Sequence, residues 1–279
     1  MNIAVLADIH GNYAALEAVA DHVDSWRPDA VVVAGDIVNR GPRSLACLRF
    51  VQARQRNHGW QAISGNHDLY VLQVARGDRP ASGVDEAVRQ NTRWAADQIG
   101  AGVSALGELP EQLSLRAPDG GEARVVHASM RGNRDNIFAG TPDAELRRQI
   151  APAPPLFCCG HTHKPLTRRI DATLVVNAGS VGAPFDGDER AAYAQLSWQP
   201  GGWAAEIVRV PYDRARTDRD FHASGFLAES GPAAPLLYAE FRAARPHLSP
   251  WMSRYGAAVL SGAISVEQSV AEYLASALV

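Results

Sequence analysis

The residues of this chain that are best suited to chemistry follow short apolar segments. They offer carboxylate oxygens, one amide oxygen and imidazole nitrogens, and there are seven of them: Asp8, His10, Asp36, Asn66, His127, His161 and His163. Carboxylates combined with imidazoles suit Mn²⁺, Fe, Zn²⁺ or Ni²⁺ better than Ca²⁺. Seven donors, one of them shared, are about right for two ions that keep positions open for water and substrate. The sequence therefore predicts a dinuclear metal site.

Two ions bridged by one carboxylate would lie about 3.5–4 Å apart, and a hydroxide shared between them could attack phosphorus in line while both cations neutralise the phosphate. The predicted chemistry is hydrolysis of a phosphate ester or anhydride. Histidine placement supports it, because five of the nine histidines fall at these turns, with His67 as the fifth. The other four are interpreted as surface or core residues: His22, His58, His222 and His247.

Strand ends must position these groups. Uninterrupted apolar runs are typical of buried parallel strands, and the runs that precede the candidate ligands are residues 3–7, 30–34, 60–64, 123–126 and 156–159. Helices are predicted between the first three runs, one capped by Asn12 and one opening at Pro42. The turn Gly65-Asn66-His67-Asp68 then presents an amide, an imidazole and a carboxylate together at the carboxyl end of a strand.

The remaining elements are predicted from their spacing and turn residues. Residues 69–102 are expected to be helical, with a loop from Gly77 to Gly83. A hairpin is expected over 113–116 and 123–126, and a short helix over 144–150. The strands 174–176, 191–198 and 203–210 are expected to complete a second sheet. The overall class is α/β, with one domain over residues 1–212.

Residues 213–279 have a different character, with Arg, Asp and Ala at helical spacing. They are predicted to form a helical C-terminal extension that packs on the core or on a partner subunit. The second arrangement would require a homo-oligomer. A lid over the substrate is the alternative. No catalytic signature was found in this segment.

Composition limits the partners. The net charge of −3 and the pI near 6.3 provide no general attraction to nucleic acid or to an anionic membrane. No apolar run approaches the roughly 20 residues of a membrane span, and the first residues do not resemble a signal peptide. The three cysteines, Cys47, Cys158 and Cys159, are expected to be reduced thiols. These features predict a cytoplasmic protein.

The ordered motifs resemble the calcineurin-like metallophosphoesterase superfamily over roughly residues 1–212. They are Asp8-x-His10, Gly35-Asp36, Gly65-Asn66-His67-Asp68, His127 and Gly160-His161-Thr162-His163. The resemblance implies a four-layer αββα sandwich, in which two mixed β-sheets lie between helices and a dinuclear metal centre sits at one edge.

The resemblance also implies how the ligands are divided between two divalent metal ions. One ion is expected to bind Asp8, His10, Asp36 and His163, and the other Asp36, Asn66, His127 and His161, so that Asp36 bridges them. Mn²⁺ is the favoured metal, with Fe, Zn²⁺, Ni²⁺ or Mg²⁺ as alternatives. His67 matches an outer-sphere histidine that contacts the phosphate or the leaving oxygen.

Four residues form the predicted catalytic set: His67, Arg40, Asp68 and Asn39. Arg40 lies in Gly35-Asp36-Ile37-Val38-Asn39-Arg40-Gly41-Pro42, which is similar to diadenosine tetraphosphatases and phosphoprotein phosphatases, where the matching arginine clamps phosphate. Asn39 departs from the phosphoprotein phosphatases, which have an aspartate there. Gly160-His161-Thr162-His163-Lys164-Pro165 and the segment from Asn177 to Gly182 instead resemble small bacterial and archaeal phosphodiesterases.

The predicted substrate is a small nucleotide with a phosphodiester or phosphoanhydride bond, such as a dinucleoside polyphosphate. Loop arginines beyond Arg40, namely Arg43, Arg131 and Arg134, are candidates for a second phosphate, and a plain surface role is their alternative. Two other functions stay open: a serine/threonine-type protein phosphatase, and a catalytically inactive scaffold on the same fold.

Overall fold

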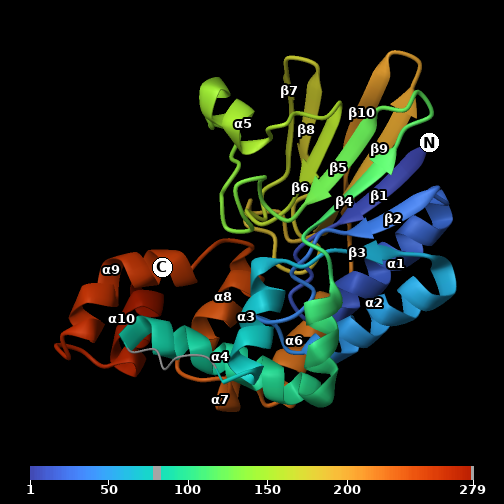
Figure 1. Ribbon diagram of the computed structural model, residues 1–279. Coiled ribbons are helices and arrows are strands. Elements are labelled where there is room, and N and C mark those ends of the chain that lie inside the picture. Colours follow the sequence, from blue (N-terminus) through green and yellow to red (C-terminus); the bar gives the residue numbers. More distant parts are fainter. Residues whose placement is uncertain (78–82, 278–279) are drawn as a thin grey trace.

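Two five-stranded sheets pack face to face in the computed structural model, which describes residues 1–77 and 83–277 (Figure 1). The first sheet has the order β10-β9-β1-β2-β3, with parallel pairing of β1, β2 and β3 and antiparallel pairing of β9 with β1 and β10. Its strands are β1 Asn2–Leu6, β2 Ala30–Val33, β3 Gln61–Ala62, β9 Ala191–Gln199 and β10 Gly202–Val210.

The second sheet is also mixed, with the order β4-β5-β6-β8-β7. Strands β5, β6 and β8 run parallel, and β4 and β7 are antiparallel edge strands. Its strands are β4 Gln112–Arg116, β5 Glu122–Val126, β6 Leu156–Cys159, β7 Leu166–Ile170 and β8 Thr173–Asn177.

The side chains of β1 point alternately into two layers of the apolar core. Ile3 and Val5 join the apolar cluster between the sheets, whereas Ala4 and Leu6 join the cluster beneath the helices. Successive strand residues point to opposite faces, so a strand buried on both sides needs an unbroken apolar sequence. The sequence of β1 meets that requirement.

Helices cover the outer faces of both sheets. On the first sheet these are α1 Tyr13–Trp26 and α2 Ser44–His58. The chain continues in α3 Asn66–Ala75, α4 Gly83–Ile99 and a 3₁₀ helix over Gly100–Glu108, and α3 and α4 lie below the sheets in Figure 1. Asn12 caps α1, because its side-chain oxygen accepts the Ala15 N–H at 3.2 Å. The short α5 Asp143–Gln149 lies on the second sheet (Figure 1).

The C-terminal helices are α6 Arg214–Ala223, α7 Phe226–Glu229, α8 Ala234–Ala243, α9 Leu248–Leu260 and α10 Val266–Ala277. They pack on the rest of the chain, because Phe226, Leu236 and Trp251 share an apolar cluster with Ala87 of α4. The red and orange helices of Figure 1 accordingly lie against α3 and α4 below the sheets. The division of the chain into two domains at residue 212 stays a prediction.

The predicted fold class, two mixed sheets between helices with a helical C-terminal region, is confirmed. The assignment of the last two strands was wrong, because β9 and β10 extend the first sheet along the free edge of β1 instead of completing the second. Strand β7 was not predicted. Residues 78–82 of the expected loop between Gly77 and Gly83 lie outside the described residues, as do the last two residues of the predicted C-terminal helix.

The three cysteines are free and buried, as expected of reduced thiols. Within residues 1–77 and 83–277 no helix is long and apolar enough to cross a membrane.

Candidate metal centre and substrate pocket

The predicted ligands come from loops that follow parallel strands of both sheets. By position they are Asp8 and His10 after β1, Asp36 after β2, Asn66 at the start of α3, His127 after β5, and His161 and His163 after β6. The carboxyl ends of these strands meet at one edge of the sandwich, and the loops therefore converge. The structure brings all seven side chains into one region.

Six of these side chains form two groups whose ligand atoms lie within 4.8 Å of one another: Asp8, His10 and His163 in one, and Asp36, His127 and His161 in the other. Asp36 also reaches the first group, since its Oδ2 lies 3.6 Å from His10 Nε2 and 3.4 Å from His127 Nε2. The seventh, Asn66, joins the second group, with its Oδ1 at 3.0 Å from His127 Nε2. This is the division that the sequence motifs imply.

The surroundings of two buried carboxylate oxygens indicate whether a cation fits at this site. In the described part of the chain, Asp8 Oδ1 and Asp36 Oδ2 have no hydrogen-bond partner, although both side chains are almost completely inaccessible to solvent. A buried carboxylate without a compensating partner costs several kcal/mol, on the order of the penalty for any desolvated ion. One such oxygen points into each ligand group, and a divalent ion would satisfy each of them. The donor set therefore fits two metal ions.

The protonation states agree with that fit. Burial lowers the pKa of His67 to about 3 and that of His161 to about 4, and it lowers the pKa of His10 well below the usual value. These three imidazoles are therefore neutral, as the two candidate ligands His10 and His161 must be to bind a metal. For His127 burial also lowers the pKa, but the Asp36 carboxylate outweighs it and raises the pKa to about 10. Without a cation the His127 imidazole is therefore protonated, and a bound cation would displace its Nε2 proton.

Backbone carbonyls orient two of the histidines. His163 Nδ1 lies 2.6 Å from the Ala183 carbonyl oxygen, and His127 Nδ1 lies 2.8 Å from the Ala34 carbonyl oxygen. Each Nδ1 therefore donates to a carbonyl, so that in the neutral ring Nε2 is the lone-pair atom on the side of the carboxylates. This tautomer presents both rings as ligands.

The loops that carry these groups have an unusual backbone. Ten non-glycine residues of the described chain have a positive φ, and seven of them belong to the candidate site: Asp8, His10, Asp36, Asn39, Arg40, His161 and His163. The left-handed conformation costs about 1–2 kcal/mol per residue for most side chains. Such residues cluster where the surrounding structure holds functional groups in place.

Asp68 is one of the groups that hold the site in place. It is fully buried and its two oxygens accept N–H groups from Asp36, Ile37, Val38 and Gly65 at 2.8–3.2 Å. These bonds fix the loop after β2 against the start of α3. Its contacts are those of a positioning residue, and it does not line the pocket formed by the described residues.

The turn from Asn177 to Gly182 lies under the site. Asn177 Nδ2 donates to the Gly160 carbonyl oxygen at 2.5 Å and to Thr162 Oγ1 at 3.1 Å, and Ser180 Oγ donates to the Asp8 carbonyl oxygen at 2.7 Å. This tight turn therefore supports both loops of the first ligand group.

Asn39 fixes the tautomer of His67. Asn39 Oδ1 accepts the Arg40 N–H at 2.9 Å, so its amide nitrogen must face His67 Nδ1, which lies 3.0 Å away. The same nitrogen reaches Thr92 Oγ1 of α4 at 3.2 Å. Because Nδ1 accepts this hydrogen bond, the neutral ring carries its proton on Nε2. His67, whose side chain is half-buried, thus offers its Nε2–H as a hydrogen-bond donor.

Arg40 lines the pocket, but it is not free. Its guanidinium forms an ion pair with Glu240 of α8, and the exposed fractions of the two side chains are 13% and 3%. It also lies 5.8 Å from the ring centroid of Phe185. The other Glu240 oxygen accepts the N–H groups of His247 and Leu248, both at 2.9 Å, where α9 begins. The sequence interpretation missed Glu240, because nothing in the local pattern of α8 distinguishes it from a surface glutamate.

The three other arginines predicted near a second phosphate differ in their surroundings. Arg43 is paired with Asp220, and Arg131 with Asp135 and Glu145, so both have carboxylate partners. Arg134 instead lies over the ring of Tyr70, 5.6 Å from its centroid, and lines the pocket. Arg134 is therefore the member of this set that faces the candidate site.

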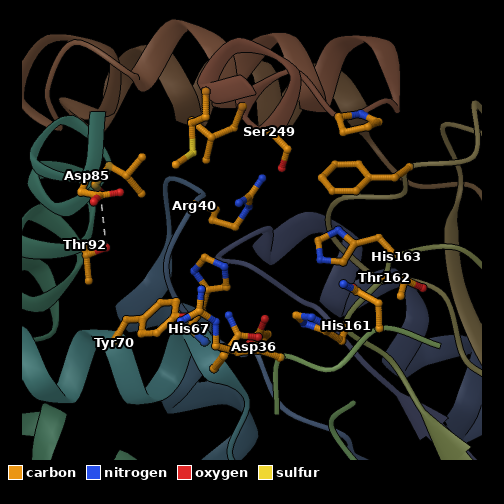
Figure 2. A pocket seen from close by; sticks show the side chains of 18 of the residues that line it. Asp36, Arg40, His67, Tyr70, Asp85, Thr92, His161, Thr162, His163 and Ser249 are labelled. Carbon is orange, nitrogen blue, oxygen red and sulfur yellow. Dashed lines mark hydrogen bonds between the residues drawn. The ribbon is translucent and has the colours of Figure 1, made fainter. Parts of the chain in front are cut away.

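The pocket above the ligands has a volume of about 1100 Å³. Its floor includes Asp36, His67, His161 and His163, while α9 forms the opposite side. Figure 2 shows Arg40 between His67 below it and Ser249 of α9 above it. A reacting phosphate would fill a small part of this volume, and the rest of the pocket is open to a larger ligand.

Comparison with known proteins identifies the family of this chain. The calcineurin-like phosphoesterase superfamily domain matches residues 1–199. The chain therefore belongs to the calcineurin-like phosphoesterase superfamily, as its motifs predicted. The match ends before α9, so that side of the pocket lies outside the family domain.

Two curated relatives are named as symmetrical bis(5′-nucleosyl)-tetraphosphatases. The protein from Delftia acidovorans is 34% identical over 131 residues, which are 47% of this chain and 45% of the relative. The protein from Chromohalobacter salexigens is 37% identical over 151 residues, 54% of this chain and 53% of the relative. The matched regions thus span about half the length of these relatives.

Among solved structures, a metallophosphoesterase from Sphaerobacter thermophilus is similar with a TM-score of 0.66 and 29% identity, over 88% of this chain and 99% of the other. A hypothetical protein from Pyrococcus horikoshii OT3 has a TM-score of 0.70 at 19% identity, over 84% of this chain and 97% of the other, and shows the fold alone.

Proposed function

We propose that this protein is a phosphoesterase that uses two divalent metal ions to hydrolyse a phosphodiester or phosphoanhydride bond of a small nucleotide. The observation that carries the proposal is the pair of ligand groups joined by Asp36, each with an orphaned carboxylate oxygen. One ion would be held by Asp8, His10, Asp36 and His163, and the other by Asp36, Asn66, His127 and His161. Mn²⁺ is the metal we favour for this mixture of carboxylates and imidazoles.

Bound divalent ions would supply a water molecule made nucleophilic at neutral pH and positive charge against the phosphate oxygens. The chain's own groups then have three tasks. Arg40 holds a non-bridging phosphate oxygen through its guanidinium. His67 donates its Nε2 proton in a hydrogen bond to the leaving oxygen, with Asn39 holding the ring. Asp68 acts through the backbone, by fixing the loop that carries Asp36.

A neutral His67 limits which leaving groups suit the enzyme. With an amide instead of a carboxylate at Asn39, burial lowers the pKa of His67 to about 3 and outweighs the charge of Asp36, which favours the imidazolium. A neutral imidazole is a weak acid. We therefore expect good substrates to have leaving groups that need little protonation, such as a phosphate or a nucleoside polyphosphate.

A dinucleoside polyphosphate is the substrate class that best meets these conditions. The names of the curated relatives point to such a substrate, and a pocket of about 1100 Å³ has room for more than one phosphate. The net charge of −3 supplies no attraction to a long nucleic acid. Three free, buried thiols fit a reducing compartment, and we place the activity in the cytoplasm.

The test is a comparison of kcat/KM on the Mn²⁺-loaded protein after removal of adventitious metal with a chelator. The substrates are diadenosine tetraphosphate, bis-p-nitrophenyl phosphate, p-nitrophenyl phosphate and a phosphoserine peptide. We expect diadenosine tetraphosphate to lead by about tenfold or more and to lose that lead in Arg40→Ala. A phosphopeptide in first place would favour a protein phosphatase, and bound metal without turnover of any substrate would favour an inactive scaffold.

A further inference from the structure

An exposed aromatic residue lies at the rim of the pocket. Among the described residues, the large apolar side chains that are exposed are Phe138 and Leu260, and Phe138 is 45% exposed. Phe138 lines the pocket, whereas Leu260 does not. An aromatic ring left in solvent at the mouth of a binding pocket is available for stacking with a flat ligand.

The loop that carries Phe138, which we name the rim loop (residues 131–141), is held firmly. The Phe138 N–H donates to Thr141 Oγ1 and its carbonyl accepts the Thr141 N–H, both at 3.0 Å. Its neighbour Ile137 is 2% exposed and anchors the loop in the core beneath α5. Gln149 of α5 donates to the Asn136 carbonyl oxygen at 2.9 Å. The exposed ring is therefore presented by a fixed backbone.

A second residue of the rim loop offers a positive charge. Arg134 lines the same pocket and lies over the Tyr70 ring, and in the described part of the chain no carboxylate forms a salt bridge with it. Tyr70 is four residues after Asn66 on α3, about 6 Å along the helix axis, and the Arg134 guanidinium lies 5.6 Å from the Tyr70 ring centroid. A phosphate next to the reacting one would lie within reach of this guanidinium.

These groups correspond to the groups of a nucleotide. The candidate metal ligands, Arg134 and Phe138, which is four residues further along the rim loop, line one pocket. We propose that the rim loop forms a nucleotide subsite, in which Arg134 binds a phosphate beyond the reacting bond and Phe138 stacks on the nucleobase. The subsite rests on the proposed function, because it requires a substrate with a phosphate chain. It adds the residues that recognise the non-reacting part of that substrate.

The chain provides a matched control for the stacking role. Phe138→Ala removes the ring and Phe138→Trp keeps an aromatic face. Leu260→Ala removes the other exposed large apolar side chain, which is 69% exposed and does not line the pocket. Arg134→Ala and Arg134→Lys test the charge separately. Both native side chains are solvent-exposed on the rim loop, so these variants should fold.

Binding is measured by calorimetry on the Mn²⁺-loaded protein with two probes. Adenosine 5′-thiomonophosphate, which resists hydrolysis, carries the base, and inorganic phosphate lacks it. We expect Phe138→Ala to weaken binding of the nucleotide by about tenfold while phosphate binding changes less than about twofold, because base stacking contributes to the first ligand alone. Phe138→Trp should bind the nucleotide as the native protein does, and Leu260→Ala should change neither affinity.

Kinetic measurements distinguish an incorrect subsite from an incorrect proposed function. Phe138→Ala and Arg134→Ala should each raise KM for diadenosine tetraphosphate by about tenfold and leave kcat/KM for p-nitrophenyl phosphate unchanged. Native affinity and native KM in Phe138→Ala would overturn the subsite and leave the phosphoesterase assignment intact. Equal losses for nucleotide and inorganic phosphate would also overturn it. Nucleotide binding that depends on Phe138 in a protein that hydrolyses none of the substrates would keep the subsite and reject the enzyme.

Discussion

Replacing Glu240 should reduce both stability and activity, because this one carboxylate joins the predicted phosphate clamp to the helix across the pocket. One oxygen pairs with Arg40, and the other accepts the N–H groups of His247 and Leu248 at the start of α9. The side chain of Glu240 is 3% exposed, so water cannot easily replace it as a partner. Its removal leaves a largely buried guanidinium and two backbone donors unpaired.

The size of the effect follows from those losses. Breaking a buried ion pair from one side costs about 3–5 kcal/mol, and we expect about 4 kcal/mol for Glu240→Ala. Unfolding entropy is about 2.1 cal/mol/K per residue, so for 279 residues this change should lower the melting temperature by about 7 °C. Glu240→Gln keeps an oxygen for the two N–H groups and loses only the charge. We expect roughly half the destabilisation, about 2 kcal/mol.

Activity should respond differently from stability. In Glu240→Gln the start of α9 is still held, but the Arg40 guanidinium loses the partner that fixes its direction. We expect kcat/KM for diadenosine tetraphosphate to fall by about tenfold, a typical cost for losing a well-aligned charged hydrogen bond. Glu240→Asp should recover part of this loss. Glu272→Ala, on the exposed side of α10, is the matched control and should change stability by less than about 0.5 kcal/mol.

A double-mutant cycle decides whether the pair is coupled. Arg40→Ala and Glu240→Ala each leave one charge buried without its partner, whereas the double variant leaves neither. The double variant should therefore be more stable than the sum of the two single effects predicts, by about 1.5 kcal/mol or more in denaturant unfolding. If the two losses instead add to within about 0.5 kcal/mol, the ion pair does not contribute as described and the reasoning fails.

Three further predictions concern the ligands, the histidine donor and acid stability. Asp36→Asn should lose both metal ions, with kcat falling at least about tenfold below that of His161→Ala, since one residue would serve both ions; near-normal metal content by atomic absorption would reject the bridge. Asn39→Asp should raise the pKa of His67 from its native value of about 3 and so improve turnover of poor leaving groups, most strongly on the acid side of the pH–rate profile; an unchanged profile would mean that the two residues are uncoupled. Asp135 has its pKa lowered from 3.8 to about 2 by its hydrogen bond from an arginine, so its stabilisation is present above pH 4 and lost as the pH falls towards 2. Asp135→Asn should therefore lose less stability than the native protein between pH 4 and pH 2, as measured by urea unfolding.

The positions of the candidate ligands could be predicted because each one depends on local sequence. An apolar strand that ends in a polar turn puts its ligand at the carboxyl edge of a parallel sheet, whatever the rest of the chain does. Asp8 after β1 and Asp36 after β2 follow that rule, and the structure places them in adjoining ligand groups. The role of Asn39 in holding His67 could also be predicted, because both residues lie in motifs of known order.

Other features depend on contacts between distant segments. Glu240 lies 200 residues from Arg40, and a glutamate on a helix shows no sign of burial in its own sequence. Strands β9 and β10 form an evident hairpin, but local pattern does not determine which sheet edge the hairpin will join, and it pairs with β1. The orientation of Arg134 towards the pocket and of Arg131 towards Asp135 likewise follows from the path of the rim loop.

Backbone conformation distinguishes an enzyme from an inactive scaffold on this fold. Seven site residues have left-handed φ angles between 47° and 72°, and four of them are neither Asp nor Asn. At roughly 1 kcal/mol each, these four alone cost on the order of 4 kcal/mol. That cost is a large share of the net stability of an ordinary domain, about 5–15 kcal/mol. Supporting bonds such as those of Asp68 and Ser180 must offset it. A scaffold that binds partners through its outer surface gains nothing from holding two carboxylates and three imidazoles in such loops, whereas an enzyme needs their side chains to converge on two ions.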